Sequence, residues 1–94
     1  MISFTIKTNK TLVGRNAIQL VHSFTPIKSA IYVSKGDRKV NAKSILGLLS
    51  AEIEEGDILC FDVINDEDAK EVDMVLQKYF LDEEWFECQS LKSI

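Results

Sequence analysis

Few residues in this chain could carry chemistry, and Ser44 is the most suggestive of them. It stands directly before the apolar run Ile45–Ser50, where a helix start would leave backbone N–H groups unpaired. A serine hydroxyl there can accept one of these N–H groups, and the positive end of the helix dipole favours a phosphate at the same place. The pattern therefore predicts a helix cap, a phosphorylation site, or both.

Other reactive side chains are scarce. His22 is the only histidine, and it falls inside a run with helical spacing, on the far side of the apolar stripe. We interpret it as a solvent-facing polar residue. Cys60 and Cys88 have no metal-ligand spacing, so we expect free thiols, one of them buried, with a disulfide as the less favoured alternative. We therefore expect no metal, no cofactor and no enzymatic activity.

Hydrophobic periodicity predicts the elements that must position these residues. Apolar residues alternate with polar ones where we expect strands, and they recur three and four residues apart where we expect helices. Asn65 offers an N-cap for the last helix. The expected elements are a strand at 2–7, a helix at 16–24, a hairpin with strands at 30–34 and 39–42, a short helix at 45–50, a strand at 58–64 and a helix at 66–80.

This order, β-α-β-β-α-β-α, is typical of an α+β two-layer domain. The two long helices can lie on one face of a four-stranded antiparallel sheet, with the strongly apolar strand 58–64 in its middle. The alternation places mostly polar side chains on the uncovered face: Ser3, Thr5, Lys7, Tyr32, Ser34, Lys39, Asn41 and Cys60. Residues 1–81 then form one domain, and residues 82–94 form a C-terminal extension. We expect its Trp85 and Phe86 to pack on that domain, over the open sheet face or beside the last helix, or else on a second subunit.

Composition excludes several classes of partner. The chain has 94 residues and a net charge of −4, with a pI of about 4.9. This balance argues against nucleic acid and against an anionic membrane surface as the main partner, because both require a dense Lys/Arg surface. With no long apolar stretch and no signal-peptide pattern, we expect a soluble, cytoplasmic protein.

Two stretches of the sequence resemble a known family. Residues Val40-Asn41-Ala42-Lys43-Ser44-Ile45-Leu46-Gly47 are close to the regulatory-serine signature of HPr, the histidine-containing phosphocarrier of the bacterial sugar phosphotransferase system. Leu12-Val13-Gly14-Arg15-Asn16-Ala17 lies over the family's active-site pattern, Leu/Ile-His-x-Arg-Pro-Ala. The resemblance covers about residues 1–80 and implies the HPr-like open-faced β-sandwich. The family also has histidine-free relatives, such as the catabolite repression HPr.

The resemblance implies a loss of the family's chemistry at the start of the first helix. Val13 occupies the position of the phosphoryl-accepting histidine and has no nucleophilic atom. Arg15 matches the family arginine that pairs with phosphate. Asn16 replaces the proline that starts the helix, and we expect it to serve as the N-cap instead.

The resemblance also implies a regulated docking surface. Ser44 matches the serine that HPr kinase/phosphorylase modifies. The family's hydrophobic docking patch corresponds to Ile45, Leu46 and Leu49, and we expect Leu48 to complete the core. We expect Arg15, Ser44 and this patch to be neighbours on one surface.

These resemblances lead to an expected function and a rival. The expected function is a non-catalytic HPr-like regulatory module that binds proteins, with phosphorylation of Ser44 as its control. The rival is a phosphocarrier or docking protein that interacts with the enzymes of the phosphotransferase system. The implied partners are HPr kinase/phosphorylase, a catabolite control regulator or phosphotransferase-system enzymes, and a homodimer remains open.

Overall fold

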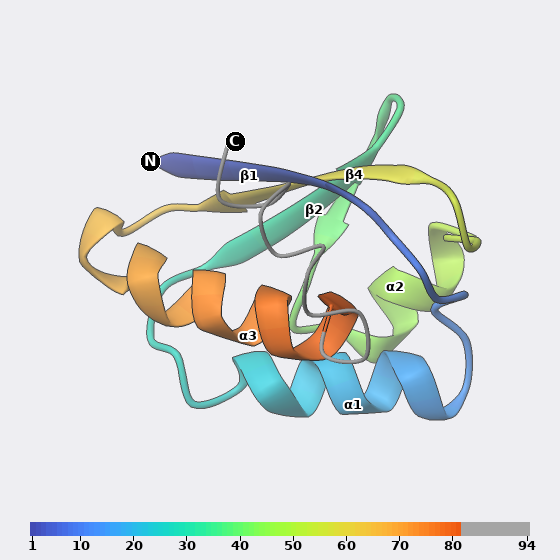
Figure 1. The fold of residues 1–94 in the computed structure, drawn as a ribbon, viewed down its shortest axis with the longest axis horizontal. Coiled ribbons are helices and arrows are strands. Elements are labelled where there is room, and N and C mark those ends of the chain that lie inside the picture. Colours follow the sequence, from blue (N-terminus) through green and yellow to red (C-terminus); the bar gives the residue numbers. More distant parts are fainter. Residues whose placement is uncertain (82–94) are drawn as a thin grey trace.

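The fold is a four-stranded antiparallel sheet with helices on one face, as the sequence predicted (Figure 1). It was obtained as a computed structural model that describes residues 1–81. The predicted extension at residues 82–94, with Trp85, Phe86 and Cys88, lies outside the described residues. The elements are β1 (Ile2–Lys7), α1 (Arg15–Phe24), β2 (Ile31–Lys35), β3 (Arg38–Asn41), α2 (Ile45–Ser50), β4 (Ile58–Val63), the 3₁₀ turn η1 (Asp66–Asp68) and α3 (Ala69–Leu81).

The strands lie in the order β1-β4-β2-β3, so β4 has a neighbour on each side. Phe61 of β4 stands opposite Phe4 of β1 and opposite Val33 of β2. β2 and β3 form the predicted hairpin, with Gly36 at a positive φ of 58° in its turn. The prediction that the most apolar strand lies in the middle of the sheet is confirmed, because β4 pairs with β1 on one side and with β2 on the other.

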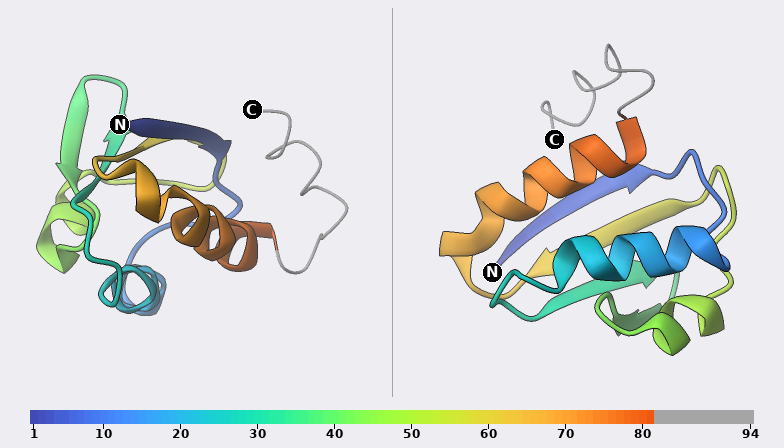
Figure 2. Two further views of the ribbon diagram at one scale, coloured as in Figure 1. Left: turned by 90° about the vertical axis from the view of Figure 1, so that its left-hand side faces the viewer. Right: turned by 90° about the horizontal axis from the view of Figure 1, so that it is seen from below.

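One face of the sheet is covered by α1 and α3, with α2 alongside α1 (Figure 2). Three phenylalanines from different layers meet in the core: Phe61 of β4 has its ring centroid 5.9 Å from that of Phe24 and 6.1 Å from that of Phe80. The apolar stripe of α1 is buried as its spacing predicts, at Ala17, Leu20, Val21 and Phe24. Sheet and helices therefore share one core.

The predicted polar face of the sheet is largely confirmed, with one unexpected burial. Leu59, Phe61 and Val63 point to the helices and are fully buried, while Cys60 between them is half-buried on the open face. Asp62 also belongs to the open face but is only 8% exposed, because side chains from neighbouring strands surround it.

Neither predicted asparagine cap makes a side-chain cap bond, although Asn65 occupies the N-cap position of η1. Gly14, at a positive φ of 51°, occupies the N-cap of α1, and Asn16 lies inside the first turn, where its amide donates to the carbonyl oxygen of Thr11 at 2.9 Å. At the other site Asn65 makes no side-chain cap bond, and η1 precedes α3. The carboxylate of Asp68, in η1, accepts the backbone N–H of Ser29 at 3.0 Å, which ties η1 to the segment before β2.

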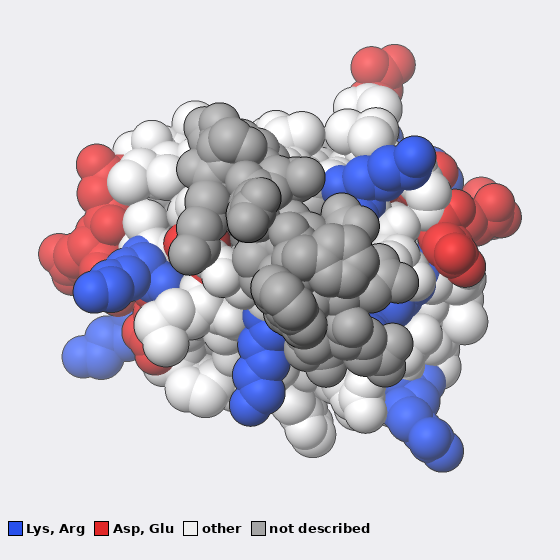
Figure 3. Space-filling view, in the orientation of Figure 1, with Lys and Arg blue, Asp and Glu red and all other residues white. Residues whose placement is uncertain are grey.

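Charge is dispersed over the surface that can be seen. On the face shown in Figure 3, outside the grey region, basic and acidic side chains are interspersed and no broad basic patch is visible. Within residues 1–81, no helix has the length and apolar character needed to cross a membrane.

Candidate functional site

Ser44 caps α2 as the sequence predicted. Its backbone is extended, with φ −111° and ψ 118°, and its Oγ accepts the backbone N–H of Gly47 at 3.0 Å. There is little room for a side chain at Gly47, because a Cβ atom there would lie 3.3 Å from Ser44 Oγ and 3.3 Å from the carbonyl oxygen of Asn41. The glycine thus allows the end of β3 to pack tightly against the first turn of α2.

Lys43 holds the segment between β3 and Ser44 in place. Its backbone N–H donates to Asn41 Oδ1 at 2.8 Å, and its Nζ donates to the carbonyl oxygen of Ile27, just beyond α1. The start of α2 is therefore held near the C-terminal end of α1.

The leucines and isoleucine of α2 divide between core and surface. Leu48 is fully buried, whereas Leu46 is 79% exposed and Ile45 and Leu49 are each more than one-third exposed. This is the division predicted for a six-residue helix, which has only one side to bury. The three exposed side chains form what we call the α2 patch: Ile45, Leu46 and Leu49.

Val13 and Arg15 stand at the start of α1. The backbone N–H of Leu12 donates to the carbonyl oxygen of Ile53 at 3.0 Å, which anchors the preceding loop. The next side chain, Val13, is 52% exposed, and Arg15 is exposed as the first residue of α1. Val13 shares a cleft of about 400 Å³ with Leu49, so the helix start and the α2 patch are continuous.

The relative direction of the two helices decides which site residues meet. Leu49, near the end of α2, lines a cleft with Val13 before α1, whereas Lys43, before α2, contacts Ile27 after α1. The two helices thus run in opposite senses, as the view from below also shows (Figure 2). Ser44 therefore lies toward one end of this α1–α2 surface and Arg15 toward the other, with the α2 patch between them.

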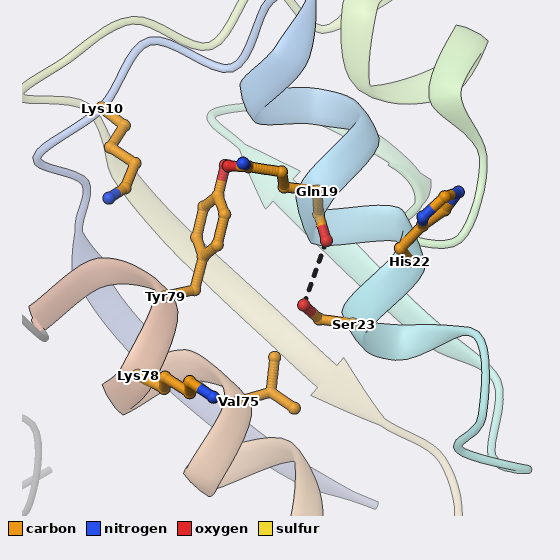
Figure 4. Close-up of a pocket in the computed structure, with 7 residues that line it drawn as sticks. All are labelled: Lys10, Gln19, His22, Ser23, Val75, Lys78 and Tyr79. Carbon is orange, nitrogen blue, oxygen red and sulfur yellow. Dashed lines mark hydrogen bonds between the residues drawn. The ribbon is translucent and has the colours of Figure 1, made fainter.

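His22 is exposed, as predicted for the far side of the apolar stripe. It lies in the last turns of α1, away from the loop that carries Val13. It is one of the residues that line a cleft between α1 and α3, although in Figure 4 its ring points away from Lys10 and Tyr79.

This open cleft of about 530 Å³ was not predicted from the sequence. Lys10 lies in the loop after β1, and Tyr79 lies in the last turn of α3. The structure brings them together, with Lys10 Nζ 4.9 Å from the centroid of the Tyr79 ring. Only the approach of α1 to α3 creates this cleft, so no local pattern could have predicted it.

A polar cluster around Asp62 was also missed. The hydroxyl of Ser3 donates to Asp62 Oδ1 at 2.7 Å, and Lys39 Nζ lies 3.0 Å from Asp62 Oδ2. The Ser3 hydrogen bond, assisted by Lys39, lowers the pKa of Asp62. Burial and the nearby carboxylate raise the pKa of the free Cys60 thiol, and because less of it is thiolate, it is a poor nucleophile.

Comparison with known proteins places this geometry in context. The family described as "PTS HPr component phosphorylation site" matches residues 2–80. A search of curated proteins gave no match.

Solved structures with a similar fold come from several bacteria. HPr-C-His from Thermoanaerobacter tengcongensis is 26% identical, with a TM-score of 0.76, over 92% of this chain and 97% of that chain. The phosphocarrier protein HPr from Bacillus anthracis str. Ames is 21% identical, with a TM-score of 0.75, over 84% and 95% of the two chains. Crh, the Bacillus subtilis catabolite repression containing protein, described as a swapped-domain dimer, is 23% identical, with a TM-score of 0.65, over 79% and 85%.

Proposed function

This chain belongs to the HPr family of phosphotransferase-system phosphocarriers, and we propose that it serves there as a regulatory protein-binding module that carries no phosphoryl group on histidine. HPr-type phosphocarriers are not enzymes themselves; they bind partner proteins and carry a phosphoryl group between them. We propose that this chain binds partner proteins but transfers no phosphoryl group.

The absence of a suitable nucleophile supports the first half of the proposal. Val13 stands where the family pattern has its histidine, and a valine side chain has no atom that can form a phosphoryl bond. His22 is the only imidazole in the chain, and it lies near the opposite end of α1. A partner that docks at Val13 would therefore not meet it.

The α2 patch carries the second half of the proposal. Leu46 is 79% exposed, Ile45 and Leu49 are each more than one-third exposed, and Leu49 lines the cleft that Val13 also lines. Contiguous apolar side chains on the surface of a small domain are typical of a site where another protein binds. Arg15 at the edge adds a cation that can bind a carboxylate or phosphate of the partner.

Phosphorylation of Ser44 is the proposed control. Its hydroxyl is half-buried and engaged by a single N–H, so the cap and the modification use the same atom. A phosphate there would add roughly −1.5 to −2 charges beside the α2 patch. A change of this size at the border of an apolar surface would alter which partner proteins bind, such as a catabolite control regulator.

Incubation with phosphoenolpyruvate, the first enzyme of the system and a radiolabel tests the loss of phosphotransfer. An ordinary HPr should acquire acid-labile label, whereas this chain should acquire none. Acid-labile label on this chain would overturn the proposal. A His22→Gln variant would then identify whether the sole imidazole had carried it.

Incubation with HPr kinase/phosphorylase and ATP, followed by mass spectrometry, tests the control. We expect one added phosphate on the intact chain and on Ser50→Ala, but none on Ser44→Ala. Ser50 is a matched control because it lies in the same helix and is exposed. No added phosphate on the intact chain, with HPr labelled in parallel, would leave Ser44 as a cap only.

A second candidate function is docking on the enzymes of the phosphotransferase system without transfer. The family match across the phosphorylation-site region and the exposed Arg15 favour it. Affinity capture from cells with Ser44→Asp, and with Ser50→Asp as control, separates the two candidates. Regulators retained specifically by Ser44→Asp favour the first, and phosphotransferase enzymes retained equally by all forms favour the second.

A further inference from the structure

We propose that the cleft between Val13 and Leu49 binds an arginine side chain of a partner protein. The stem of the arginine would lie on these two residues, and its guanidinium group would pair with Glu52 and Glu54. The inference rests on the proposed function, because it names the chemistry that a partner brings to the edge of the α2 patch.

The lining of this cleft combines apolar and polar side chains. Val13 is 52% exposed and Leu49 is 38% exposed, while Ile53, which also lines the cleft, is buried. The other described residues of the lining are polar: Thr11, Lys35, Glu52 and Glu54. A cleft of this mixed character suits arginine, because that side chain joins an apolar stem to a cationic head.

Lys35, which lines the cleft, is already paired. Its Nζ lies 2.9 Å from Asp57 Oδ2 and donates to the backbone carbonyl oxygen of Glu52 at 2.6 Å. Asp57 also accepts the backbone N–H of Glu54 at 2.7 Å. This hydrogen bond, followed by the contact with Lys35, lowers the pKa of Asp57. Asp57 therefore stays ionised and balances the charge of Lys35.

Glu52 and Glu54 are available to a partner. Both are exposed, and neither carboxylate forms an ion pair within residues 1–81. Lys35 is the only cation among the described residues that line the cleft, so the surplus charge there is negative and attracts a cation. Arginine suits this site better than lysine, because its planar guanidinium group presents several N–H donors to carboxylates in a fixed geometry.

The loop that carries the two glutamates is held against the loop before α1. The backbone N–H of Leu12 donates to the carbonyl oxygen of Ile53 at 3.0 Å. The backbone N–H of Glu55 donates to Thr11 Oγ1 at 3.1 Å. These bonds fix the backbone at Val13 relative to the acidic loop before a partner arrives, which lowers the entropic cost of binding.

Leu49 belongs both to this cleft and to the α2 patch. One partner surface can therefore place an arginine in the cleft and apolar side chains on the patch, an arrangement typical of residues that dominate binding energy. The glutamates would also exclude partners that present a carboxylate at this position, because like charges repel.

Two short peptides test this chemistry without a partner protein. One has a single arginine between neutral residues, and the other has citrulline, a neutral isostere, in its place. In a titration followed by NMR, the arginine peptide should shift the methyl signals of Val13 and Leu49, and its binding should weaken as salt is added. The citrulline peptide should bind more weakly and without this dependence on salt.

Glu52→Gln and Glu54→Gln test the two charged contacts. Each should weaken binding of the arginine peptide by roughly 1.5- to 5-fold, as for a single exposed ion pair. Glu67→Gln, the same charge change at an exposed residue of η1, should leave the affinity unchanged. Far-ultraviolet circular dichroism of each variant verifies that the fold persists.

Equal binding of the arginine and citrulline peptides would overturn the proposal. Equal effects of Glu54→Gln and Glu67→Gln would do so too. Arg38 is exposed in the β2–β3 hairpin and could be supplied by a second copy of the chain. Methyl shifts that grow with protein concentration alone and vanish in Arg38→Gln would assign the cleft to that copy instead of a partner.

The proposed function fails or survives separately, because its test depends on Leu46. Loss of partner capture in Leu46→Glu, together with equal binding of the two peptides, would refute this inference alone. Unchanged capture in Leu46→Glu, together with selective binding of the arginine peptide, would refute the role of the α2 patch and leave the chemistry of the cleft supported.

Discussion

The hydroxyl of Tyr79 donates a hydrogen bond to the backbone carbonyl oxygen of Asn16, and this bond ties the last turn of α3 to the first turn of α1. The two residues are 63 positions apart in the chain. Their contact joins α3 to α1, the helix at whose start the proposed docking surface lies. Burial of the phenol raises the pKa of Tyr79 to about 12.

Tyr79→Phe should lower the free energy of unfolding by about 0.5–1.5 kcal/mol, because it removes one hydrogen bond and leaves the Asn16 carbonyl without that partner. Equilibrium unfolding in urea measures the change. Tyr32→Phe is the matched control, since the Tyr32 ring keeps its contact with Lys39 when the hydroxyl is removed. Equal losses in the two variants would contradict a specific role for the Tyr79 bond.

Alkaline pH should destabilise the protein through the same phenol. The pKa of Tyr79 is raised in the folded state, from 10.0 to about 12. Its contribution is therefore complete below pH 10 and is lost as pH rises toward 12, where the unfolded chain releases its proton first. The stability difference between the intact chain and Tyr79→Phe should shrink over this range, as measured by urea unfolding at each pH.

Acid should destabilise the cluster around Asp62. Its carboxylate accepts from Ser3 and pairs with Lys39, and its pKa is lowered from 3.8. The stability that it contributes is present above pH 3.8 and falls as pH drops toward the folded-state pKa. Asp62→Asn should cost about 1.5–3 kcal/mol at neutral pH and less in acid. Asp37→Asn, at an exposed turn, should cost little at either pH.

Ser44 variants should separate the cap from the modification. Ser44→Ala should lower stability by about 1 kcal/mol, because the Gly47 N–H loses its acceptor. Ser44→Asp should restore most of this loss, since aspartate is also a strong N-cap. Thermal unfolding measures both. If Ser44→Asp were as unstable as Ser44→Ala, changes in its partner binding could not be attributed to charge alone.

Leu48 and Leu46 of α2 should affect different properties, stability in the first case and partner binding in the second. Leu48→Ala should lower stability by about 2–5 kcal/mol, because its side chain is fully buried. Leu46→Glu should leave the melting temperature nearly unchanged and abolish capture of partner proteins, since that side chain is 79% exposed. Met74→Glu is the control for an exposed apolar residue on another helix. Unchanged capture by Leu46→Glu would contradict the role of the α2 patch.

Local patterns were sufficient for most of the fold. Hydrophobic periodicity predicted every strand and α-helix of residues 1–81 but not the 3₁₀ turn η1, because a strand or helix that buries one face must repeat its apolar residues at that period. The cap at Ser44 and the division between Leu48 and Leu46 followed from the same local rules. The asparagine caps were not predicted correctly: Asn16 donates to the carbonyl oxygen of Thr11, outside its own helix, and Asn65 makes no side-chain bond to η1.

The sequence by itself determined which chemistry was absent at Val13 and which hydroxyl stood before α2, because residue identity and helix capping are local. Only the tertiary structure decided that Ser44 and Arg15 lie toward opposite ends of one surface, since that depends on the direction of α2 against α1. It also created the cleft beside Tyr79 and buried Asp62. These features depend on contacts between side chains from distant segments, and the hydrophobic period of a single element does not predict such contacts.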